Sequence, residues 1–162
     1  MEIRSCAFTG HRKIEPQHKT AISSRVAAGI AFVYSEGCRH FYVGGAVGFD
    51  TIAAQQLLIF RMSHPDITIN LVLPCKDQTS QWSDRQREMY DYLLSQANTV
   101  EYMAENYYKG CMRARNARLV ECADVVIAYL GHERSGAQQT VDMARHQGKV
   151  IYNIYNTCES AL

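Results

Sequence analysis

Three short polar segments that contain glycine each follow an apolar run, and their residue types suit the binding of a phosphate group. They are residues 9–12 (TGHR), 44–50 (GGAVGFD) and 131–137 (GHERSGA). Glycine has no Cβ, so backbone N–H groups can approach an anion closely and φ can be positive. A helix that starts directly after such a turn adds free N–H groups and the positive end of its dipole.

The segment 44–50 gives the most specific signal for phosphate binding of the three, because three glycines lie between an expected strand and an expected helix. It is neither a GxGxxG fingerprint nor a Walker A loop, since no Gly-Lys-Ser/Thr follows. A tight turn without a ligand has the same composition, so both interpretations stay open. Gly136 precedes another helix, and a second anion cradle there would suit a ligand with a phosphate and further polar groups, such as a nucleotide.

Residues 109–118 (KGCMRARNAR) carry four basic residues and no acid. Arginine suits bidentate contacts with phosphate or carboxylate. Arg113 and Arg118 are interpreted as a solvated face. Arg115 lies one position off the apolar stripe of this helix, where its side chain can reach over the rim, whereas Asn116 lies on the stripe. Both are favoured as binding residues by the resemblance described below.

Three other residues each leave more than one role open. His11 either contacts a phosphate, or acts as a general acid, or is a hydrogen-bonding surface residue. Asp50 either caps the following helix or bonds a ribose hydroxyl. Trp82 either stacks on a base or packs under its loop. No HExxH motif and no Cys/His pair with zinc spacing is present, so no metal site is expected.

Apolar runs alternate with amphipathic ones along the whole chain. Strands are expected at 3–8, 40–43, 67–73, 99–103, 124–130 and 150–154, and helices at 17–36, 49–62, 83–97, 108–122 and 138–147. This order predicts an α/β fold, with a mainly parallel, doubly wound sheet and helices on both faces. We expect one domain over residues 1–155 and an irregular tail over 156–162. The carboxyl ends of the strands then share one rim, where such folds bind ligands.

Composition excludes several classes of protein. The 162 residues carry 17 Lys+Arg and 16 Asp+Glu, a net charge of +1 that argues against holding nucleic acid by bulk electrostatics. The apolar fraction of 47% is typical of a folded protein. No leader segment and no apolar run long enough for a bilayer is apparent, and the six cysteines form no CxxC pair. We therefore expect a cytoplasmic protein with reduced thiols and no membrane contact.

Taken together, these segments resemble the YpsA-like branch of the SLOG superfamily, whose members are related to the LOG phosphoribohydrolases and to the DprA family. The motifs that carry the resemblance are spread over almost the whole chain. They are Thr9-Gly10-His11-Arg12, Gly44-Gly45-Ala46-x-Gly48-Phe49-Asp50, Leu73-Pro74-Cys75 with Gln81-Trp82, Tyr108-x-Gly110-x-Met112 with Arg115-Asn116, and Asp124.

The resemblance implies a single Rossmann-like domain, of bacterial type, that binds or senses a nucleotide or an NAD-derived ligand, without firmly indicating a cofactor. It also implies a homodimer or a higher homo-oligomer. We expect a small-molecule nucleotide as the partner rather than nucleic acid. The expected binding residues are Thr9, Gly10, His11, Arg12, Gly44, Gly45, Ala46, Gly48, Asp50, Pro74, Trp82, Arg115, Asn116, Ser135, Gly136 and Ala137.

One departure from the LOG pattern concerns catalysis. LOG enzymes carry a glycine-rich motif with a catalytic Glu before the last helix, and Asp142 stands at that position here. Two alternatives stay open beside binding. The first is hydrolysis of a nucleotide N-glycosidic bond, with Asp142, Asp50 or His11 as candidate catalytic residues. The second is a DprA-like single-strand nucleic-acid binder, supported only by the basic stretch 109–118.

Overall fold

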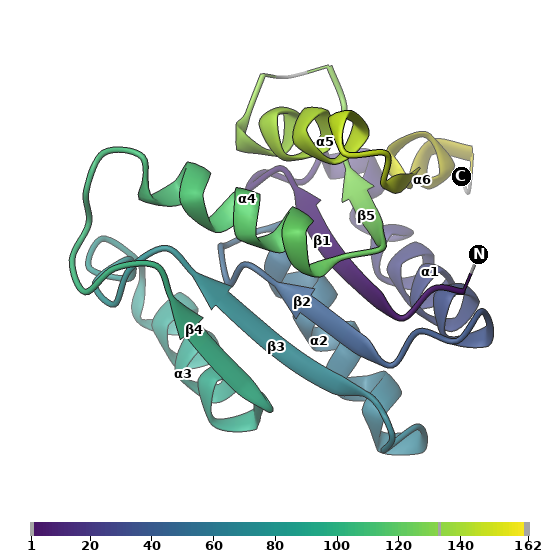
Figure 1. The fold of residues 1–162 in the computed structure, drawn as a ribbon, viewed down its shortest axis with the longest axis horizontal. Coiled ribbons are helices and arrows are strands. Elements are labelled where there is room, and N and C mark those ends of the chain that lie inside the picture. Colours follow the sequence, from purple (N-terminus) through teal and green to yellow (C-terminus); the bar gives the residue numbers. More distant parts are fainter. Residues whose placement is uncertain (1, 133, 161–162) are drawn as a thin grey trace.

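The computed structural model describes residues 2–132 and 134–160, and it contains a six-stranded, wholly parallel sheet (Figure 1). The order of the strands across the sheet is β4-β3-β2-β1-β5-β6. The strands are β1 (Ser5–Gly10), β2 (His40–Val43), β3 (Thr68–Leu73), β4 (Thr99–Tyr102), β5 (Val125–Tyr129) and β6 (Val150–Asn153). The predicted doubly wound α/β fold is confirmed. Residues 1, 133, 161 and 162, which belong to the predicted domain and tail, lie outside the described residues.

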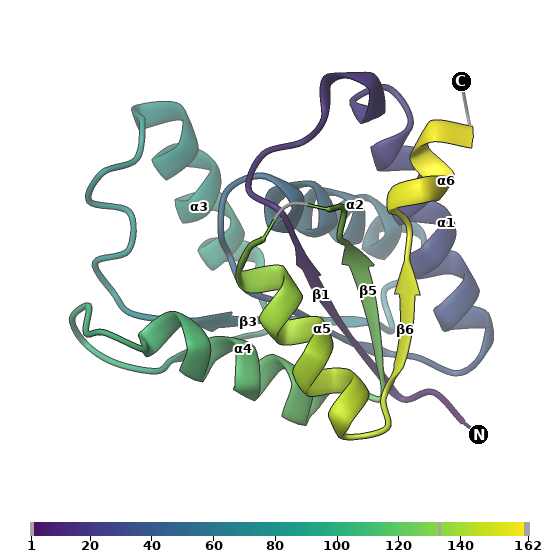
Figure 2. The same ribbon diagram turned by 90° about the horizontal axis from the view of Figure 1, so that it is seen from above.

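The helices form a layer on each face of the sheet (Figure 2). One layer holds α1 (Ile22–Ser35), α2 (Phe49–Ser63), α3 (Asp84–Gln96) and α6 (Tyr155–Ser160), and the other holds α4 (Cys111–Cys122) and α5 (Gly136–His146). A short 3₁₀ helix, η1 (Pro16–His18), precedes α1. None of the described helices is long and apolar enough to cross a membrane.

Local sequence explains where these helices begin. Ser83 starts α3 with a capping box, in which its side chain accepts from the Gln86 N–H and the Gln86 side chain accepts from the Ser83 N–H. The predicted start of the fourth helix at residue 108 is three residues early. Gly110 has a left-handed φ of 101°, so the helix begins only at Cys111.

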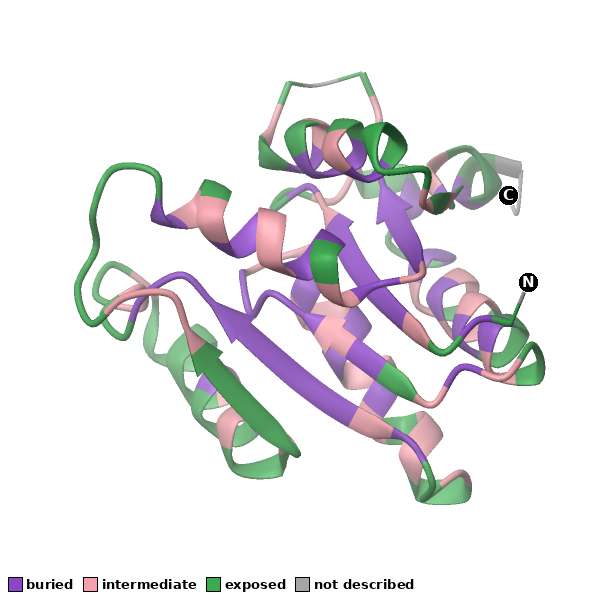
Figure 3. Cartoon of the chain, viewed as in Figure 1, coloured by how far each residue is buried: buried purple, intermediate pink, exposed green. Residues whose placement is uncertain are grey.

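The core lies on both sides of the central strands. Every residue of β5 is buried, as its unbroken apolar run predicts, and Figure 3 shows β1, β3 and β5 largely in the buried colour. The larger apolar cluster packs α1 and α2 on the sheet through side chains such as Val26, Ile30 and Leu57. A smaller cluster on the opposite face includes Leu119 and Ala144.

The segment expected to be an irregular tail instead forms α6, so that expectation is wrong for residues 156–160. Cys158 is fully buried in the larger apolar cluster, and the Tyr155 ring lies 5.0 Å from that of Tyr129. The buried imidazole of His18 bonds the Tyr129 hydroxyl (2.6 Å), and its Nε2 lies 3.3 Å from the Glu159 carboxylate. Tertiary contacts with η1 and β5 therefore order a helix too short to form alone.

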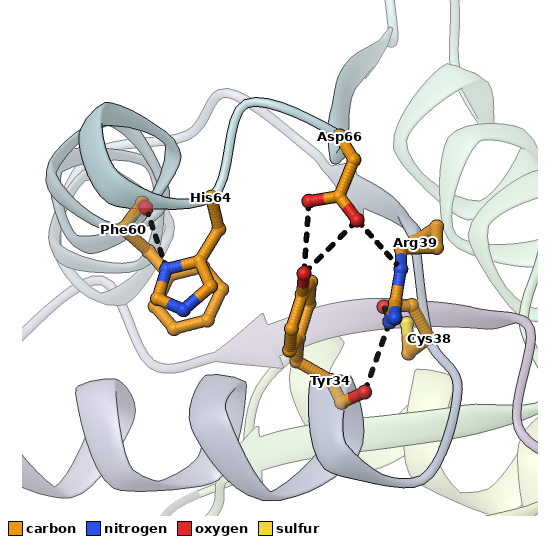
Figure 4. A network of polar contacts seen from close by, with 6 residues as sticks. All are labelled: Tyr34, Cys38, Arg39, Phe60, His64 and Asp66. Carbon is orange, nitrogen blue, oxygen red and sulfur yellow. Dashed lines mark hydrogen bonds and ion pairs between the residues drawn. The ribbon is translucent and has the colours of Figure 1, made fainter.

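A polar cluster ties the elements together at the amino ends of β2 and β3 (Figure 4). The Tyr34 hydroxyl donates to the Asp66 carboxylate at 2.9 Å, and Arg39 Nε lies 3.0 Å from the same carboxylate. The Arg39 guanidinium also lies 3.8 Å from the centre of the Tyr34 ring. The hydroxyl, the guanidinium and the carboxylate are thus hydrogen-bonded or ion-paired with one another at the protein surface.

The topology places a crevice at the opposite end of the sheet. From β1 the chain passes to β2 on one side, whereas from β5 it passes to β6 on the other. β1 and β5 are neighbours, so the connections diverge between them. At such a switch point, loops leave in opposite directions and open a crevice beyond the carboxyl ends of the strands.

Candidate functional site

A cavity of about 310 Å³ lies at this switch point, and it gathers most of the binding residues that the sequence predicts. Its lining comes from the segment after β1, the turn before α2, one face of α4 and the start of α5. The predicted residues that line it are Thr9, Gly10, His11, Arg12, Ala46, Asp50, Arg115, Asn116, Ser135, Gly136 and Ala137. Four lining residues were not predicted from the sequence, and they are Phe8, Lys13, Met112 and Leu119.

Arg115 is the central cation of the cavity, and it is 6% exposed. Its Nη1 donates to the Gly44 carbonyl, and its Nε donates to Asn116 Oδ1 at 2.8 Å. Burial lowers the pKa of the guanidinium, and the neighbouring Asp50 carboxylate opposes that shift. These two hydrogen bonds hold the planar fork at the cavity wall, and they do not use all of its N–H donors.

Asp50 supplies a buried carboxylate beside this cation. Its Oδ2 accepts from the Ala46 N–H at 3.1 Å. Burial raises the pKa of Asp50, whereas the Arg115 charge and the Ala46 bond lower it. A Cβ at Gly44 would lie 2.6 Å from Arg115 Nη1 and 2.9 Å from Asp50 Oδ2, so glycine is required for the carboxylate and the guanidinium to approach this turn.

His11 and Ser135 form a pair that resembles a nucleophile and its base, but the hydrogen bonds exclude that arrangement. The Gly131 N–H donates to His11 Nε2 at 2.9 Å, so Nε2 is the unprotonated nitrogen. In the neutral ring the proton is then on Nδ1, which donates to Ser135 Oγ at 2.9 Å. His11 therefore orients Ser135 and does not take its proton.

The start of α5 faces the cavity with hydrogen-bond donors. Ser135 Oγ also accepts from the Ala137 N–H at 3.2 Å, which leaves the Ser135 hydroxyl proton as a donor. At Gly136 no side chain separates the backbone from the cavity. A Cβ on Gly136 would meet nothing nearer than Asn116 Nδ2 at 3.5 Å, an ordinary contact. The fold itself therefore does not require glycine at this position.

We expected the glycines of the 44–48 turn to bind the phosphate, but Gly44, Gly45 and Gly48 do not line the cavity. Gly48 has a φ of 82°, and a Cβ there would lie 2.1 Å from the Arg12 carbonyl oxygen. The Phe49 N–H already donates to the His11 carbonyl at 3.2 Å. The segment after β1 thus covers the start of α2, and of this turn only Ala46 lines the cavity.

Charge at the cavity is predominantly positive. Arg12 and Lys13 are exposed at its mouth, where they add to buried Arg115, and Asp50 is the one carboxylate among the described lining residues. Lys13 was missed although it directly follows the TGHR segment, and its adjacency to Arg12 was the available signal. The arrangement suits an anion that also offers a donor to Asp50.

Three candidates from the sequence lie elsewhere. Trp82 packs edge-on against Tyr90, with ring centres 5.4 Å apart, and lines a different cavity. Asp142 is exposed on α5 and accepts from Gln138 Nε2 at 2.9 Å. Pro74 does not line the cavity either. No group of three or more metal-ligating side chains occurs among the described residues.

A parallel sheet with this strand order and a polar cavity at its switch point define a Rossmann-like α/β domain. Within that class, the family described as the YspA SLOG family matches residues 6–157. The chain therefore belongs to this SLOG family.

Curated relatives match the chain in sequence, and solved structures share its fold. A UPF0398 protein of Bacillus cereus (strain ATCC 14579) is 25% identical over 124 residues, which are 75% of this chain and 67% of the relative. The structure of DNA processing protein A from Helicobacter pylori superposes with a TM-score of 0.67 at 21% identity, over 91% of this chain and 63% of that one. DNA processing protein A (DprA) from Streptococcus pneumoniae gives 0.65 at 18% identity, over 91% of this chain and 49% of that one.

One of these structures corrects our expectation about partners. We expected a small-molecule nucleotide rather than nucleic acid, mainly because the net charge is near zero. The H. pylori protein, which shares this fold, is described by its single-stranded DNA binding mode. A net charge near zero therefore does not exclude a nucleic-acid partner for a protein of this fold, because a local cluster of cations can bind phosphates even when the whole chain is balanced.

Proposed function

We propose that the chain binds a nucleotide, or a nucleotide derivative, through its phosphate in the cavity at the switch point. The observation that carries the proposal is the convergence of Arg115, Arg12 and Lys13 with the start of α5 on a 310 Å³ space. The Ser135 hydroxyl and the backbone at Gly136 add donors on the same wall. A phosphate placed there meets several charge-assisted hydrogen bonds and the positive end of a helix dipole.

Asp50 favours a nucleotide over a bare inorganic anion. A buried carboxylate repels an anion, so a site for phosphate alone gains nothing from it. A ribose hydroxyl can donate to this carboxylate while the attached phosphate meets the cations. The cavity volume is at the small end of the range for small-molecule sites. It suits the ribose phosphate, with the base towards the mouth.

The same geometry supports binding and sensing over hydrolysis. Asp142 is exposed and outside the lining, so it is not available at this cavity. Both ring nitrogens of His11 already form hydrogen bonds, Nε2 with the Gly131 N–H and Nδ1 with Ser135, so neither is placed to transfer a proton to a ligand. Asp50 remains as a single carboxylate without a described acid or base partner, and we expect the ligand to be recovered unchanged.

The test is a thermal-shift screen of the chain with nucleoside mono-, di- and triphosphates, NAD and ADP-ribose. A ligand specific for the folded state raises the unfolding free energy by roughly 2.7 kcal/mol at a hundredfold excess over its Kd. We expect a shift that is lost in the double variant Arg12→Ala/Lys13→Ala and kept in Arg145→Ala, an exposed cation in the last turn of α5. Absence of any shift, or equal shifts in both variants, contradicts the proposal.

A second candidate function, single-strand nucleic-acid binding, is supported by the loop before α4. Tyr107 and Tyr108 are exposed there, the exposed Lys109 follows them in the chain, and Arg113 is exposed in the first turn of α4. Aromatic rings stack on unpaired bases and cations follow the phosphates. Anisotropy with a labelled oligothymidylate should show affinity that falls steeply with salt and is weakened by Tyr107→Ala/Tyr108→Ala. A flat salt response removes this candidate.

A further inference from the structure

The helix α6 packs beside the segment that leads from β5 to the cavity at the switch point. It begins directly after β6, at the carboxyl end of the sheet (Figure 2), and none of the described residues 155–159 lines the cavity. The segment that the start of α6 contacts is 130–131, and the chain continues from there to Ser135 and Gly136 in the cavity wall. Through this segment α6 can act on the cavity without touching a ligand.

Two contacts fix residues 130 and 131 against the start of α6. The Asn153 side chain accepts from the Leu130 N–H at 3.1 Å and donates to the Leu130 carbonyl oxygen at 2.9 Å. Asn153 Oδ1 also accepts from the Tyr155 N–H at 3.2 Å. The Tyr155 ring lies against Gly131, where a Cβ would be 2.5 Å from it, so glycine is needed for this close packing. The end of β6 and the start of α6 therefore set the position of the Gly131 backbone.

The Gly131 N–H in turn determines which nitrogen of His11 carries the proton. It donates to His11 Nε2 at 2.9 Å, so in the neutral ring the proton is on Nδ1, which donates to Ser135 Oγ at 2.9 Å. Ser135 Oγ also accepts from the Ala137 N–H, and its own proton remains available to a ligand. In the other tautomer Nδ1 would accept the Ser135 proton, and the cavity would lose that donor.

We propose that Tyr155 is a positioning residue for the phosphate site. Its ring holds the Gly131 N–H on His11 Nε2, which keeps the His11 proton on Nδ1 and leaves the Ser135 proton for a phosphate oxygen. The effect on a ligand rests on the nucleotide site proposed above, whereas the effect on the His11 tautomer requires no ligand.

The alternative is that the Tyr155 ring contributes packing alone. Its centre lies 5.0 Å from that of Tyr129 and 4.7 Å from that of His18, so its loss should lower stability in either case. A purely structural ring would nevertheless leave the His11 tautomer unchanged. The state of the His11 imidazole therefore separates the two roles.

The first test follows the His11 ring nitrogens by NMR in the chain without a ligand. We expect the Nδ1–H tautomer in wild type and in Tyr155→Phe, which keeps the ring, and a mixture of both tautomers in Tyr155→Ala. The matched control is Tyr152→Ala, which removes a ring on β6 that packs 5.5 Å from Phe32, outside the cavity lining. An unchanged tautomer in Tyr155→Ala, or the same change in Tyr152→Ala, overturns the proposal.

A second variant alters the same contact from the other side. Gly131→Ala places a Cβ where the Tyr155 ring lies, so either the ring or the residue 131 backbone must move. We expect the His11 tautomer to change in this variant as well, while Tyr155 and the rest of α6 are retained in the sequence. A folded Gly131→Ala with the wild-type tautomer also overturns the proposal.

The last test is calorimetric titration with a nucleoside monophosphate. Tyr155→Ala should weaken binding roughly threefold to tenfold, the effect of one neutral hydrogen bond, whereas Tyr155→Phe and Tyr152→Ala should bind as wild type does. In a Ser135→Ala background, Tyr155→Ala should weaken binding no further, because the donor is already absent. If wild type binds and Tyr155→Ala binds equally well, the positioning role is wrong. If wild type does not bind while Tyr155→Ala changes the His11 tautomer, the nucleotide site is wrong and the control of His11 by Tyr155 stands.

Discussion

The two ends of the sheet use polar side chains in opposite ways. At the amino end, Tyr34, Arg39 and Asp66 pair with one another beside solvent and fasten the α1–β2 and α2–β3 connections (Figure 4). At the carboxyl end, Arg115 and Asp50 are buried and line a cavity. Burial of charge is costly unless partners repay it, and surface pairs contribute little. Under the proposed function, the buried charges of the carboxyl end serve a ligand, whereas those of the amino end join elements of the fold.

The largest effect that separates the two ends should come from deleting their arginines. Arg115→Ala leaves the Asp50 carboxylate and the Gly44 carbonyl without their buried partner, so we expect a loss of about 3–5 kcal/mol of unfolding free energy. Arg39→Ala removes a half-exposed ion pair and should cost about 1 kcal/mol. Urea unfolding of both variants measures the difference. Equal losses would mean that the two ends are energetically alike.

The two carboxylates should give the fold pH dependences of opposite sign. Burial raises the pKa of Asp50 above 3.8, so the folded state keeps this proton longer and the Asp50 contribution to stability falls as pH rises from 3.8 to the raised value. The Tyr34 hydrogen bond lowers the pKa of Asp66, so its contribution is present above 3.8 and is lost as pH falls through the lowered value.

Urea unfolding across this acidic range separates the two contributions. Asp50→Asn should become more stable relative to wild type as pH rises through the Asp50 window. Asp66→Asn should become less stable relative to wild type at lower pH, as pH rises from the lowered Asp66 pKa to 3.8. Parallel curves for the two variants would refute the assigned signs.

Gly136→Ala distinguishes a ligand contact from a structural glycine. The added Cβ meets only Asn116 at 3.5 Å, and alanine is favoured over glycine in a helix, so the unfolding free energy should stay level or rise by up to about 1 kcal/mol. Binding of a nucleotide should nevertheless weaken, because the methyl group obstructs approach to the start of α5. Calorimetric titration together with a melting curve provides both values. Unchanged affinity would remove α5 from the phosphate site.

The smallest expected effect concerns the mouth of the cavity. Arg12→Ala removes an exposed cation, so melting should not change, whereas nucleotide affinity should fall several-fold and depend less on salt. Arg145→Ala, on the exposed last turn of α5, should change neither property. If both variants lose the same affinity, the attraction comes from the whole molecule and not from this site.

Periodicity and local chemistry predicted most of the fold from the sequence. The stripe of Val26, Ile30 and Val33 predicted α1, and the apolar run of β5 predicted a strand covered on both faces. The helix α6 was not predicted, because it is stabilised by the burial of Cys158 and by contacts with η1. A segment of six residues is too short to show these contacts as a helical pattern in the sequence.

The site was predictable where a residue's position followed from its own element. Helical spacing placed Arg115 near the rim, the family resemblance favoured Asn116, and glycine before a helix singled out Gly136. The sequence could not show that the Arg12 carbonyl covers Gly48, because that contact joins segments far apart in the chain. We therefore expected the phosphate at the 44–48 turn, whereas the site that we propose has its phosphate at the start of α5.

The most direct test is an amide NMR titration of the chain with a nucleoside monophosphate. We predict chemical-shift changes confined to residues 9–13, 112–116 and 135–137, with none at Tyr34, Arg39 or Asp66. That result would place the anion at the carboxyl end of the sheet. Saturating changes centred on the amino-end cluster, or no change at the three predicted segments, would contradict the central claim.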